Sequence, residues 1–405
     1  MLHRLENTIQ DYAWGSTDAL AELYGVDNGS DRPMAELWMG AHPKAPSRVV
    51  VGADEIGLDE YIARDPAGAL GSAAQIADGR LPFLFKILCA AAPLSIQVHP
   101  SLEQAREGFR REDEAGIDRA APNRNYRDAN HKPELICAIR PFWGLRGFRS
   151  VAEIRDELTT VELSEADASI ALPDTEDDLA RFFTGLLSLA EGERRELIAA
   201  AVSLARGRWH GASGPTPPEP GDPLARYYWV LRIAGEHPGD VGILAPLFMN
   251  VFSLRPGQAT YQPAGVLHAY LSGVGAELMA NSDNVLRGGM TVKHIDADEL
   301  AKVGLFRSEE PVVLSGEPEE HDGCTEVSYP APFDEFAFSR LTTGPGCSIS
   351  ARTPQILFCH AGPVRLRTDD QEIELAAGES AFVDAGTGEI GVSGAGEILR
   401  ARVPG

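Results

Sequence analysis

Short apolar runs, separated by glycine and proline, fill most of this 405-residue chain. The chain holds 41 glycines and 28 prolines, and in residues 1–149 and 240–405 these bound apolar runs of about 4–8 residues. Runs of that length with turn-forming residues at both ends are typical of β-strands. In residues 240–405 the turn signals recur about every 8–12 residues, as in a sandwich or barrel. We therefore expect a mainly β protein.

Residues 150–236 have a different pattern. Three stretches, residues 177–189, 191–206 and 223–235, carry apolar residues three and four positions apart, which is the spacing of one face of a helix. Ser150 and Glu153 form a capping-box pattern at the start of this region. A proline-rich linker at residues 211–221 suits an exposed loop. These features predict a helical domain of residues 150–239 inserted into the β structure.

Charge and composition exclude several classes of partner. Lysine and arginine number 36 against 60 acidic residues, a net charge of -24. Such an acidic surface repels phosphate backbones and anionic lipids, so we expect no nucleic-acid or membrane partner. The most apolar stretch, residues 81–98, contains Lys86 and two prolines, which predicts buried strands and not a membrane span. An anionic small-molecule substrate would need its own local cations.

The five cysteines predict reduced thiols. Their number is odd and no two form a CxxC pair, which fits a cytoplasmic protein better than a disulfide framework. The first residues carry no apolar signal core, so we expect a cytoplasmic location. The oligomeric state is unknown from these patterns.

One histidine follows a turn of defined spacing. Gly257, Pro263, Gly265 and His268 form the pattern G-x5-P-x-G-x-x-H, which resembles the second motif of the cupin superfamily. Cupins are double-stranded β-helix (jelly-roll) proteins in which this histidine binds a metal. The same spacing returns at residues 378–389 without the proline and the histidine. We therefore expect two cupin-type jelly rolls, only the first of which binds a metal.

A second candidate ligand segment surrounds His99. Ser95, Gln97 and His99 lie two residues apart, so on a strand they share a face. The first cupin motif reads H-x-H-x3–4-E, and here Gln97 and His99 hold the place of the two histidines. Spacing nominates Glu103 as the acidic ligand and leaves Glu134 as an alternative.

Two further segments bring charged groups. Lys132 and Glu134 stand two apart at the mouth of an apolar strand. Pro133 favours extended geometry at Lys132, so we expect the two side chains to share a face. In residues 275–294, glycines follow Arg287 and allow a close approach to a ligand. Lys293 adds a second cation in this segment.

Taken together, seven segments resemble type I phosphomannose isomerases. In sequence order they are residues 10–15 (QDYAWG), 36–43 (ELWMGAHP), 83–88 (FLFKIL), 95–100 (SIQVHP), 130–134 (NHKPE), 268–270 (HAY) and 282–289 (SDNVLRGG). Two departures from the family are Ala13, where relatives often carry an acid, and the helical region, which matches no motif.

The resemblance implies one Zn²⁺ per chain, held by Gln97, His99, Glu134 and His268. It thus prefers Glu134 to Glu103. It also implies the reversible conversion of D-mannose 6-phosphate to D-fructose 6-phosphate, an aldose–ketose isomerisation through a cis-enediol(ate). Alternatives from other classes are a cupin oxygenase using Fe(II), which Gln97 disfavours, and a sugar-phosphate-binding cupin without catalysis.

Roles for the remaining residues follow from the same resemblance and from the chemistry. Arg287 falls on the family's catalytic arginine and is suited to stabilising the enediolate. The general base is Lys132 or Glu277, a choice that the sequence leaves open. Lys86 and Ser95 are expected to bind the phosphate, with Arg287 and Lys293 as the alternative. The expected pocket wall consists of Trp14, Glu36, His42, Tyr270 and Asp283.

The expected architecture has three parts. Residues 1–149 and 240–315 form a catalytic metal-binding cupin domain, and residues 150–239 form the inserted helical domain. Residues 316–405 form a smaller C-terminal jelly roll without metal.

Overall fold

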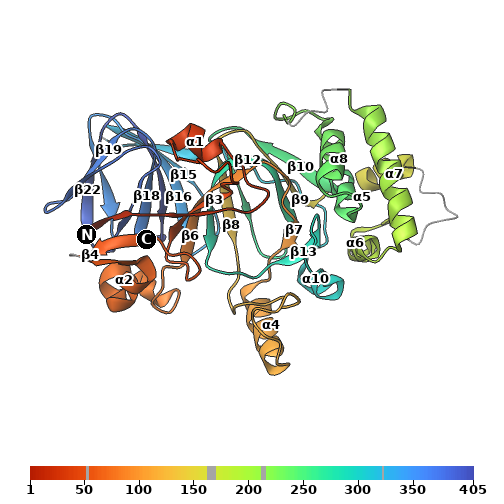
Figure 1. The fold of residues 1–405 in the computed structure, drawn as a ribbon, viewed down its shortest axis with the longest axis horizontal. Helices are drawn as coiled ribbons and strands as arrows, with labels where there is room; N and C mark the ends of the chain where they lie inside the picture. The colour runs from red at the N-terminus through yellow and green to blue at the C-terminus, as the bar shows by residue number, and fades with distance from the viewer. Residues whose placement is uncertain (52–53, 162–169, 211–215, 322) are drawn as a thin grey trace.

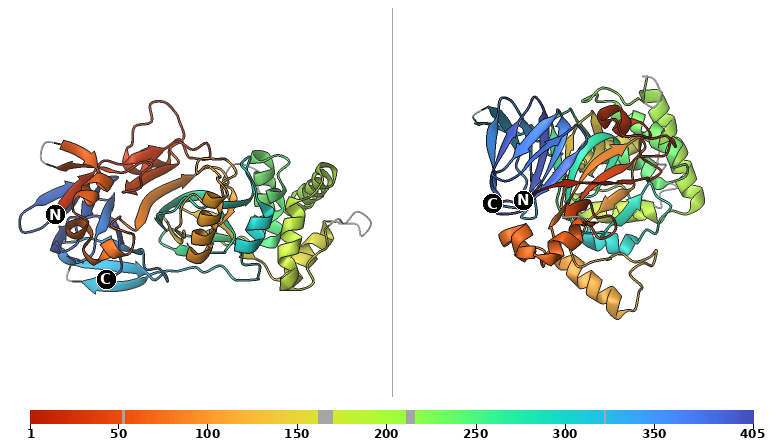
Figure 2. Two further views of the ribbon diagram at one scale, coloured as in Figure 1. Left: turned by 90° about the horizontal axis from the view of Figure 1, so that it is seen from below. Right: turned by 60° about the vertical axis from the view of Figure 1, so that its left-hand side comes forward.

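A computed structural model describes residues 1–51, 54–161, 170–210, 216–321 and 323–405 (Figure 1). It is mainly β, as predicted. In the views of Figures 1 and 2, a central β region lies between the C-terminal strands on one side and a group of helices on the other. No helix in these ranges is long and apolar enough to cross a membrane.

The first sheet forms the central region. One strand, β12 (His268–Ala280), organises it, because β12 pairs with β6, β7, β8 and β9 along its length. All eight residues of β6 are buried, as expected for an apolar run that Lys86 alone interrupts. The strands of this sheet are β2 (Thr8–Gln10), β3 (Glu36–Gly40), β6 (Phe83–Ala90), β7 (Ile96–Val98), β8 (Glu134–Ala138), β9 (Phe142–Phe148), β10 (Met249–Leu254), β11 (Ala259–Gln262), β12 and β13 (Leu286–Gly289).

The helices of residues 151–248 pack into a common apolar core at one end of this sheet. Helix α5 begins with a capping box between Ser150 and Glu153, as the sequence predicts. The start of the predicted linker, residues 211–215, lies outside the described residues. The elements are α5 (Val151–Thr160), η2 (Glu176–Asp178), α6 (Leu179–Leu187), α7 (Glu191–Arg208), α8 (Ala225–Glu236), η3 (Val241–Leu244) and α9 (Ala245–Phe248).

Two further sheets hold the C-terminal strands. The second sheet contains β14 (Glu317–His321), β15 (Cys324–Tyr329), β16 (Ala337–Thr342), β18 (Gln355–Ala361), β21 (Ser380–Val383) and β23 (Glu397–Arg402). The third contains β17 (Cys347–Ala351), β19 (Val364–Arg367), β20 (Glu372–Leu375) and β22 (Gly388–Ser393). Strand β1 (Leu2–Leu5) joins the second sheet, where Leu2 pairs with Val383. The start of the chain is therefore part of the C-terminal β structure.

Short elements fill the edges. Strands β4 (Arg48–Val51) and β5 (Asp54–Gly57) form a separate pair. The remaining helices are α1 (Ala19–Tyr24), α2 (Leu58–Arg64), α3 (Pro66–Leu70), η1 (Gly71–Gln75), α4 (Leu102–Glu114) and α10 (Ala297–Val303).

The two copies of the repeated spacing take the same local shape. Gly265 precedes His268 in a left-handed conformation with φ +82°, and Gly386 stands at the matching place with φ +72°. The backbone N–H of Gly265 donates to the carbonyl of His99 at 2.8 Å. This turn thus ties together the two segments that carry the candidate histidine ligands.

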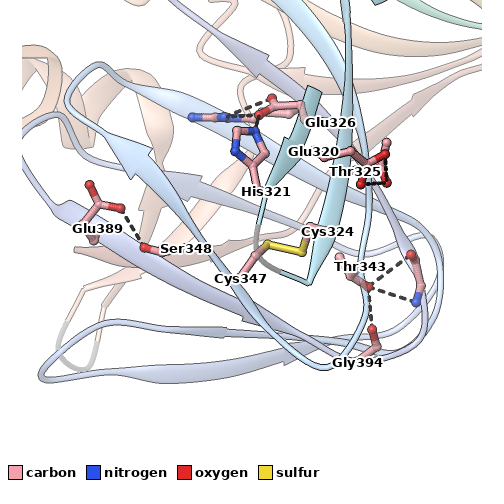
Figure 3. Close-up of a disulfide and its surroundings, with 12 residues drawn as sticks. Glu320, His321, Cys324, Thr325, Glu326, Thr343, Cys347, Ser348, Glu389 and Gly394 are labelled. Carbon is pink, nitrogen blue, oxygen red and sulfur yellow. Dashed lines mark hydrogen bonds and ion pairs between the residues drawn. A yellow bond between two sulfur atoms is a disulfide. The ribbon is translucent and has the colours of Figure 1, made fainter. Parts of the chain in front are cut away.

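The prediction that all cysteines are reduced is wrong for one pair. Cys324 and Cys347 form a disulfide that joins the first residues of β15 and β17 (Figure 3). These strands belong to different sheets, so only the tertiary fold brings the two thiols together. Cys89, Cys137 and Cys359 are free and buried.

Candidate metal centre and active site

A cavity of about 610 Å³ opens beside β12. Nearly all the side chains that the sequence analysis singled out line it. They are Trp14, Glu36, His42, Lys86, Ser95, Gln97, Lys132, Glu134, Tyr270, Glu277, Asp283, Arg287 and Lys293. His99 and His268 are buried and are not among the residues that line the cavity.

His99, Glu134 and His268 form a compact buried group. Nε2 of His99 lies 3.3 Å from Oε1 of Glu134, and Nε2 of His268 lies 3.2 Å from Oε2. Candidate ligand atoms of the three residues lie within 4.8 Å of one another. Glu103, by contrast, is exposed on helix α4. The fold therefore brings Glu134, and not Glu103, to the histidines.

The histidine tautomers make this group a fit for a cation. Nδ1 of His99 lies 2.8 Å from the carbonyl of Asn284, and Nδ1 of His268 lies 3.0 Å from that of Val266. A carbonyl only accepts, so each Nδ1 carries the proton and each Nε2 presents a lone pair. Both Nε2 atoms and Oε2 of Glu134 are buried without a hydrogen-bond partner among the described residues. A metal ion would satisfy all three atoms.

The charges of the group favour a metal ligand set. Burial lowers the pKa of His99 to about 4, so its ring is neutral at pH 7. Burial alone would raise the pKa of Glu134, but the charge of the neighbouring Lys132 ammonium holds it well below its ordinary value. The ammonium of Lys132 lies 3.2 Å from Oε1 of Glu134. The carboxylate is therefore ionised, as metal binding requires.

Gln97 and Arg287 enter the site on neighbouring strands. In the sheet register, Gln97 of β7 stands opposite His268 of β12 on one side and Arg287 of β13 on the other. Directly opposed residues lie about 4.5–5.5 Å apart at Cβ. The register therefore sets Gln97 beside the histidine and Arg287 next to Gln97.

A chain of buried polar groups crosses the cavity floor. The ammonium of Lys86 lies 2.9 Å from Glu277 and 3.3 Å from Glu36. The indole N–H of Trp38 donates to the second oxygen of Glu36 at 2.8 Å. Burial raises the pKa of Glu277 above its ordinary value. Lys86 is thus held between two carboxylates.

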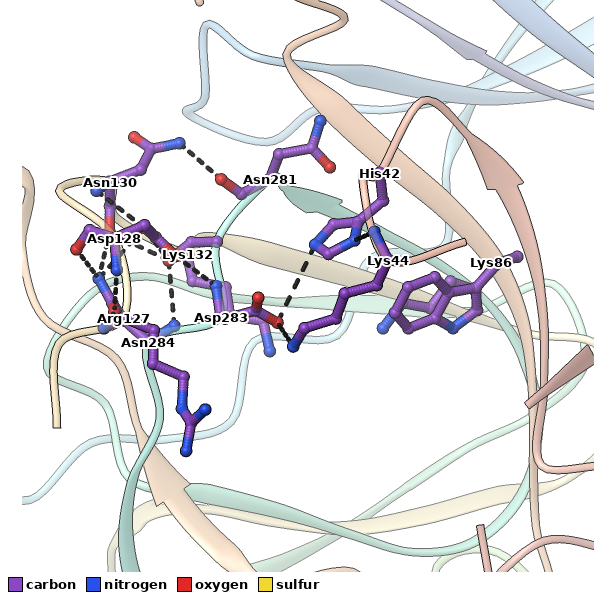
Figure 4. Close-up of polar contacts among 12 residues, drawn as sticks. His42, Lys44, Lys86, Arg127, Asp128, Asn130, Lys132, Asn281, Asp283 and Asn284 are labelled. Atoms are coloured by element: carbon purple, nitrogen blue, oxygen red, sulfur yellow. Dashed lines mark hydrogen bonds and ion pairs between the residues drawn. The ribbon is translucent and has the colours of Figure 1, made fainter. Parts of the chain in front are cut away.

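Cations gather at the cavity mouth. Burial and the charge of Arg127 lower the pKa of Arg287. Burial and the charges of Arg287 and Arg127 lower the pKa of Lys293. Lys44 lines the same mouth and lies 2.8 Å from Asp283 (Figure 4). Sequence reasoning missed Lys44 and Arg127. The available signal was a basic residue just after the 36–43 segment and another just before the 130–134 segment, in an acidic chain.

Asn284 connects the loop that carries Arg127 to the candidate ligand His99. Its side chain accepts from the backbone N–H of Arg127 at 2.7 Å and donates to the carbonyls of Asp128 and Asn130 at 2.8 and 2.9 Å (Figure 4). Its own backbone carbonyl accepts the hydrogen bond from Nδ1 of His99. The loop of residues 127–130 and the candidate ligand His99 are therefore positioned by one buried residue.

Comparisons with known proteins agree on one family. The family described as "Phosphomannose isomerase type I, catalytic domain" matches residues 2–151, and "Mannose-6-phosphate isomerase, cupin domain" matches residues 325–403. The mannose-6-phosphate isomerase of Escherichia coli is 42% identical, over 98% of this chain and 99% of its own. The probable mannose-6-phosphate isomerase of Caenorhabditis elegans is 31% identical, over 95% of this chain and 91% of its own.

Solved structures agree over the whole chain. A zinc-bound mannose 6-phosphate isomerase superposes with a TM-score of 0.89 at 38% identity, covering 99% of both chains. A mutant phosphomannose isomerase from Salmonella typhimurium superposes with a TM-score of 0.90, also at 38% identity and 99% coverage of both chains.

Proposed function

Because the chain belongs to the type I phosphomannose isomerase family, we propose that it interconverts D-mannose 6-phosphate and D-fructose 6-phosphate with one bound Zn²⁺. The observation that carries the proposal is the buried group of His99, Glu134 and His268, with its unpartnered ligand atoms. The full-length similarity to mannose-6-phosphate isomerases and to a zinc-bound structure supports both the reaction and the metal.

Gln97 is the fourth protein ligand in this proposal. Its position opposite His268 in the sheet supports that role, and two histidines, a carboxylate and an amide oxygen suit zinc. When bound, zinc supplies a Lewis acid that stabilises negative charge developing on the sugar oxygens.

The chain's own residues perform the remaining steps of the isomerisation. After ring opening, a base moves a proton between C2 and C1 through a cis-enediolate. Arg287, placed beside Gln97 by the register, stabilises the enediolate charge. Glu277 is the proposed base, because its buried carboxyl has a raised pKa and is held in place by Lys86. Lys132 is the alternative base.

The phosphate end of the substrate is assigned to the cavity mouth. Lys86 and Ser95 were the first candidates for this role from the sequence, but the charge of Lys86 is balanced by Glu277 and Glu36. A phosphate dianion placed there would meet two carboxylates and be repelled. Lys293 lines the mouth and carries the charge that a phosphate requires, whereas Lys44 is already paired there with Asp283 at 2.8 Å.

The position of the candidate metal site is consistent with a division of the chain into domains. We infer that residues 150–239 form the inserted helical domain and that residues 316–405 form a jelly roll without metal. In the described residues, the group of His99, Glu134 and His268 is the one cluster of histidine, cysteine and carboxylate ligand atoms close enough for a metal. That cluster lies outside residues 316–405.

Conversion of mannose 6-phosphate to fructose 6-phosphate tests the proposal directly. We expect turnover by the purified protein, its loss on treatment with a chelator, and its return when zinc is added. A coupled assay for fructose 6-phosphate measures all three states on one sample. A folded, zinc-loaded protein without turnover would overturn the proposed function.

Replacement of Arg287 by alanine is expected to lower kcat about 10²–10³-fold, because one preorganised donor to a developing oxyanion contributes that much. Zinc should stay bound, since Arg287 is not a proposed ligand, so metal content is measured on the same samples. Arg106, which is exposed on helix α4, provides the control substitution. Near-normal turnover in Arg287→Ala would remove this residue from the mechanism.

A further inference from the structure

The side chain of Asp240 joins the helical region to the cavity wall. Asp240 precedes η3, and its Oδ1 accepts from the backbone N–H of Gly242 at 2.7 Å. The same carboxylate accepts from the N–H of Met290 at 2.8 Å and from that of Thr291 at 3.0 Å. One carboxylate thus caps the N-terminus of the short helix η3 and also accepts from two consecutive N–H groups of a distant segment.

The segment that it holds is strained. Met290 is buried, lines the cavity and has a left-handed backbone with φ +52°. The other described non-glycine residues with positive φ are Asp31 and Asp78, and aspartate tolerates this region through its short polar side chain. Methionine has no such group, so the conformation of Met290 must be enforced by its surroundings.

The backbones meet closely at this point. A Cβ atom added to Gly242 would lie 2.9 Å from the backbone nitrogen of Met290, and one added to Gly289 would lie 3.2 Å from Cα of Gly242. Glycine at both positions therefore lets the helical region approach the segment near enough for the Asp240 hydrogen bonds. Val292, in the same segment, is fully exposed and lines the cavity, so its side chain does not hold the turn in place.

This turn separates the two cations of the same loop. Arg287 precedes Met290 by three residues and Lys293 follows it by three, and both line the cavity. The N–H of Lys293 also donates to the hydroxyl of Thr291 at 3.1 Å. A change of the turn would therefore move Lys293 relative to Arg287.

We propose that Asp240 is a positioning residue for phosphate recognition: its carboxylate holds the Met290 turn in its left-handed form and so places Lys293 at the cavity mouth. This inference rests on the proposed function, and it gives the helical region a part in substrate binding. Asp240 acts through backbone groups and does not itself touch the substrate.

The test compares Asp240→Ala with Asp222→Ala. Asp222 accepts from the N–H of Leu224 at 2.8 Å just before helix α8, so it is a matched loop aspartate on the same region. In zinc-loaded protein, we expect Asp240→Ala to weaken the binding of inorganic phosphate and to raise KM for mannose 6-phosphate, each about tenfold or more. kcat should change much less, and Asp222→Ala should change neither constant. Asp240→Asn, which keeps one acceptor oxygen, should give a smaller effect and replaces the alanine variant if that fails to fold.

A second substitution separates positioning from general damage. Glycine adopts a left-handed backbone without the steric penalty, so Met290→Gly in the Asp240→Ala background should restore part of the lost phosphate affinity. A merely structural role of Asp240 would lower the unfolding midpoint and the active fraction, with no such rescue. Equal phosphate binding by the wild type and Asp240→Ala, or no phosphate binding by the wild type, overturns the inference. Absence of isomerase turnover in a wild type that binds phosphate overturns the proposed function alone.

Discussion

Replacing His268 with alanine is expected to abolish zinc binding and turnover together. The ring is completely buried, and its Nδ1 is held by the carbonyl of Val266, so Nε2 is aimed at Glu134 before any metal arrives. Removing it leaves three proposed ligands and an empty space. Mutating a residue that only hydrogen-bonds to a metal ligand lowers metal affinity about 10–100-fold. Because His268 is itself a proposed ligand, its loss should lower zinc affinity by more than that.

Two measurements that do not depend on activity check this result. Metal content after gel filtration should fall from near one zinc per chain to near zero. Added zinc should also raise the unfolding free energy of the wild type, by about 2.7 kcal/mol at a hundred times Kd, and should leave that of His268→Ala unchanged. His360→Ala is the control, because His360 is half-buried in the C-terminal β structure and should leave zinc in place. A fully metallated His268→Ala protein would contradict the assignment of this ligand.

The sequence was informative wherever the chemistry lies on one continuous segment. Gly265 and His268 belong to one turn and the strand that follows it, so their spacing was enough to predict that His268 lies on a strand just after the turn. The face shared by Lys132 and Glu134 also depends only on local extended geometry, and the two side chains do meet in an ion pair. Local periodicity likewise predicted helices α6, α7 and α8, and the capping-box pattern of Ser150 and Glu153 marked the start of α5.

Contacts between distant strands were not predictable in this way. Spacing nominated Glu103 and left Glu134 as the alternative, and only the resemblance to the family preferred Glu134. In the structure Glu134 pairs with Met279 of β12, the strand that also carries His268. Lys86 stands opposite Glu277 in the register of β6 and β12, so its charge is used within the protein. No residue of either segment reveals that pairing.

The same limit explains the remaining differences. The disulfide joins strands of two sheets, and strand β1 pairs with β21 from the other end of the chain. The hydrogen bonds of Asp240 join positions fifty residues apart. Each of these contacts depends on the tertiary arrangement. Hydrophobic periodicity and residue spacing along one segment carry no information about that arrangement.

Replacement of Glu277 by glutamine is expected to lower kcat about 10²–10⁴-fold, the usual contribution of a positioned general base. Glutamine keeps the size of the side chain and an oxygen that accepts from Lys86, so the cavity floor should persist. It removes the negative charge of the side chain and, with it, the capacity to take a proton. KM and zinc content should therefore change little, and both are measured with kcat.

The pH profile gives the more specific test. A base must be ionised to act, and burial raises the pKa of Glu277 above its ordinary value, so kcat/KM of the wild type should fall as pH drops through that raised value. Glu277→Gln should lose this acidic limb along with the rate. Glu277→Ala should regain part of the rate when formate is added, because a small carboxylate can enter the space and accept the proton.

Lys132→Ala decides between the two candidate bases. Lys132 contacts Glu134 at 3.2 Å, so its loss should disturb a proposed metal ligand and lower zinc affinity. With saturating zinc, the Glu277 assignment predicts that Lys132→Ala retains the acidic limb and that formate has no effect on its rate. If Lys132→Ala instead shows the larger loss of kcat at full zinc occupancy, and Glu277→Gln keeps the acidic limb, the base is Lys132. Glu277 would then serve to hold Lys86 in the cavity floor.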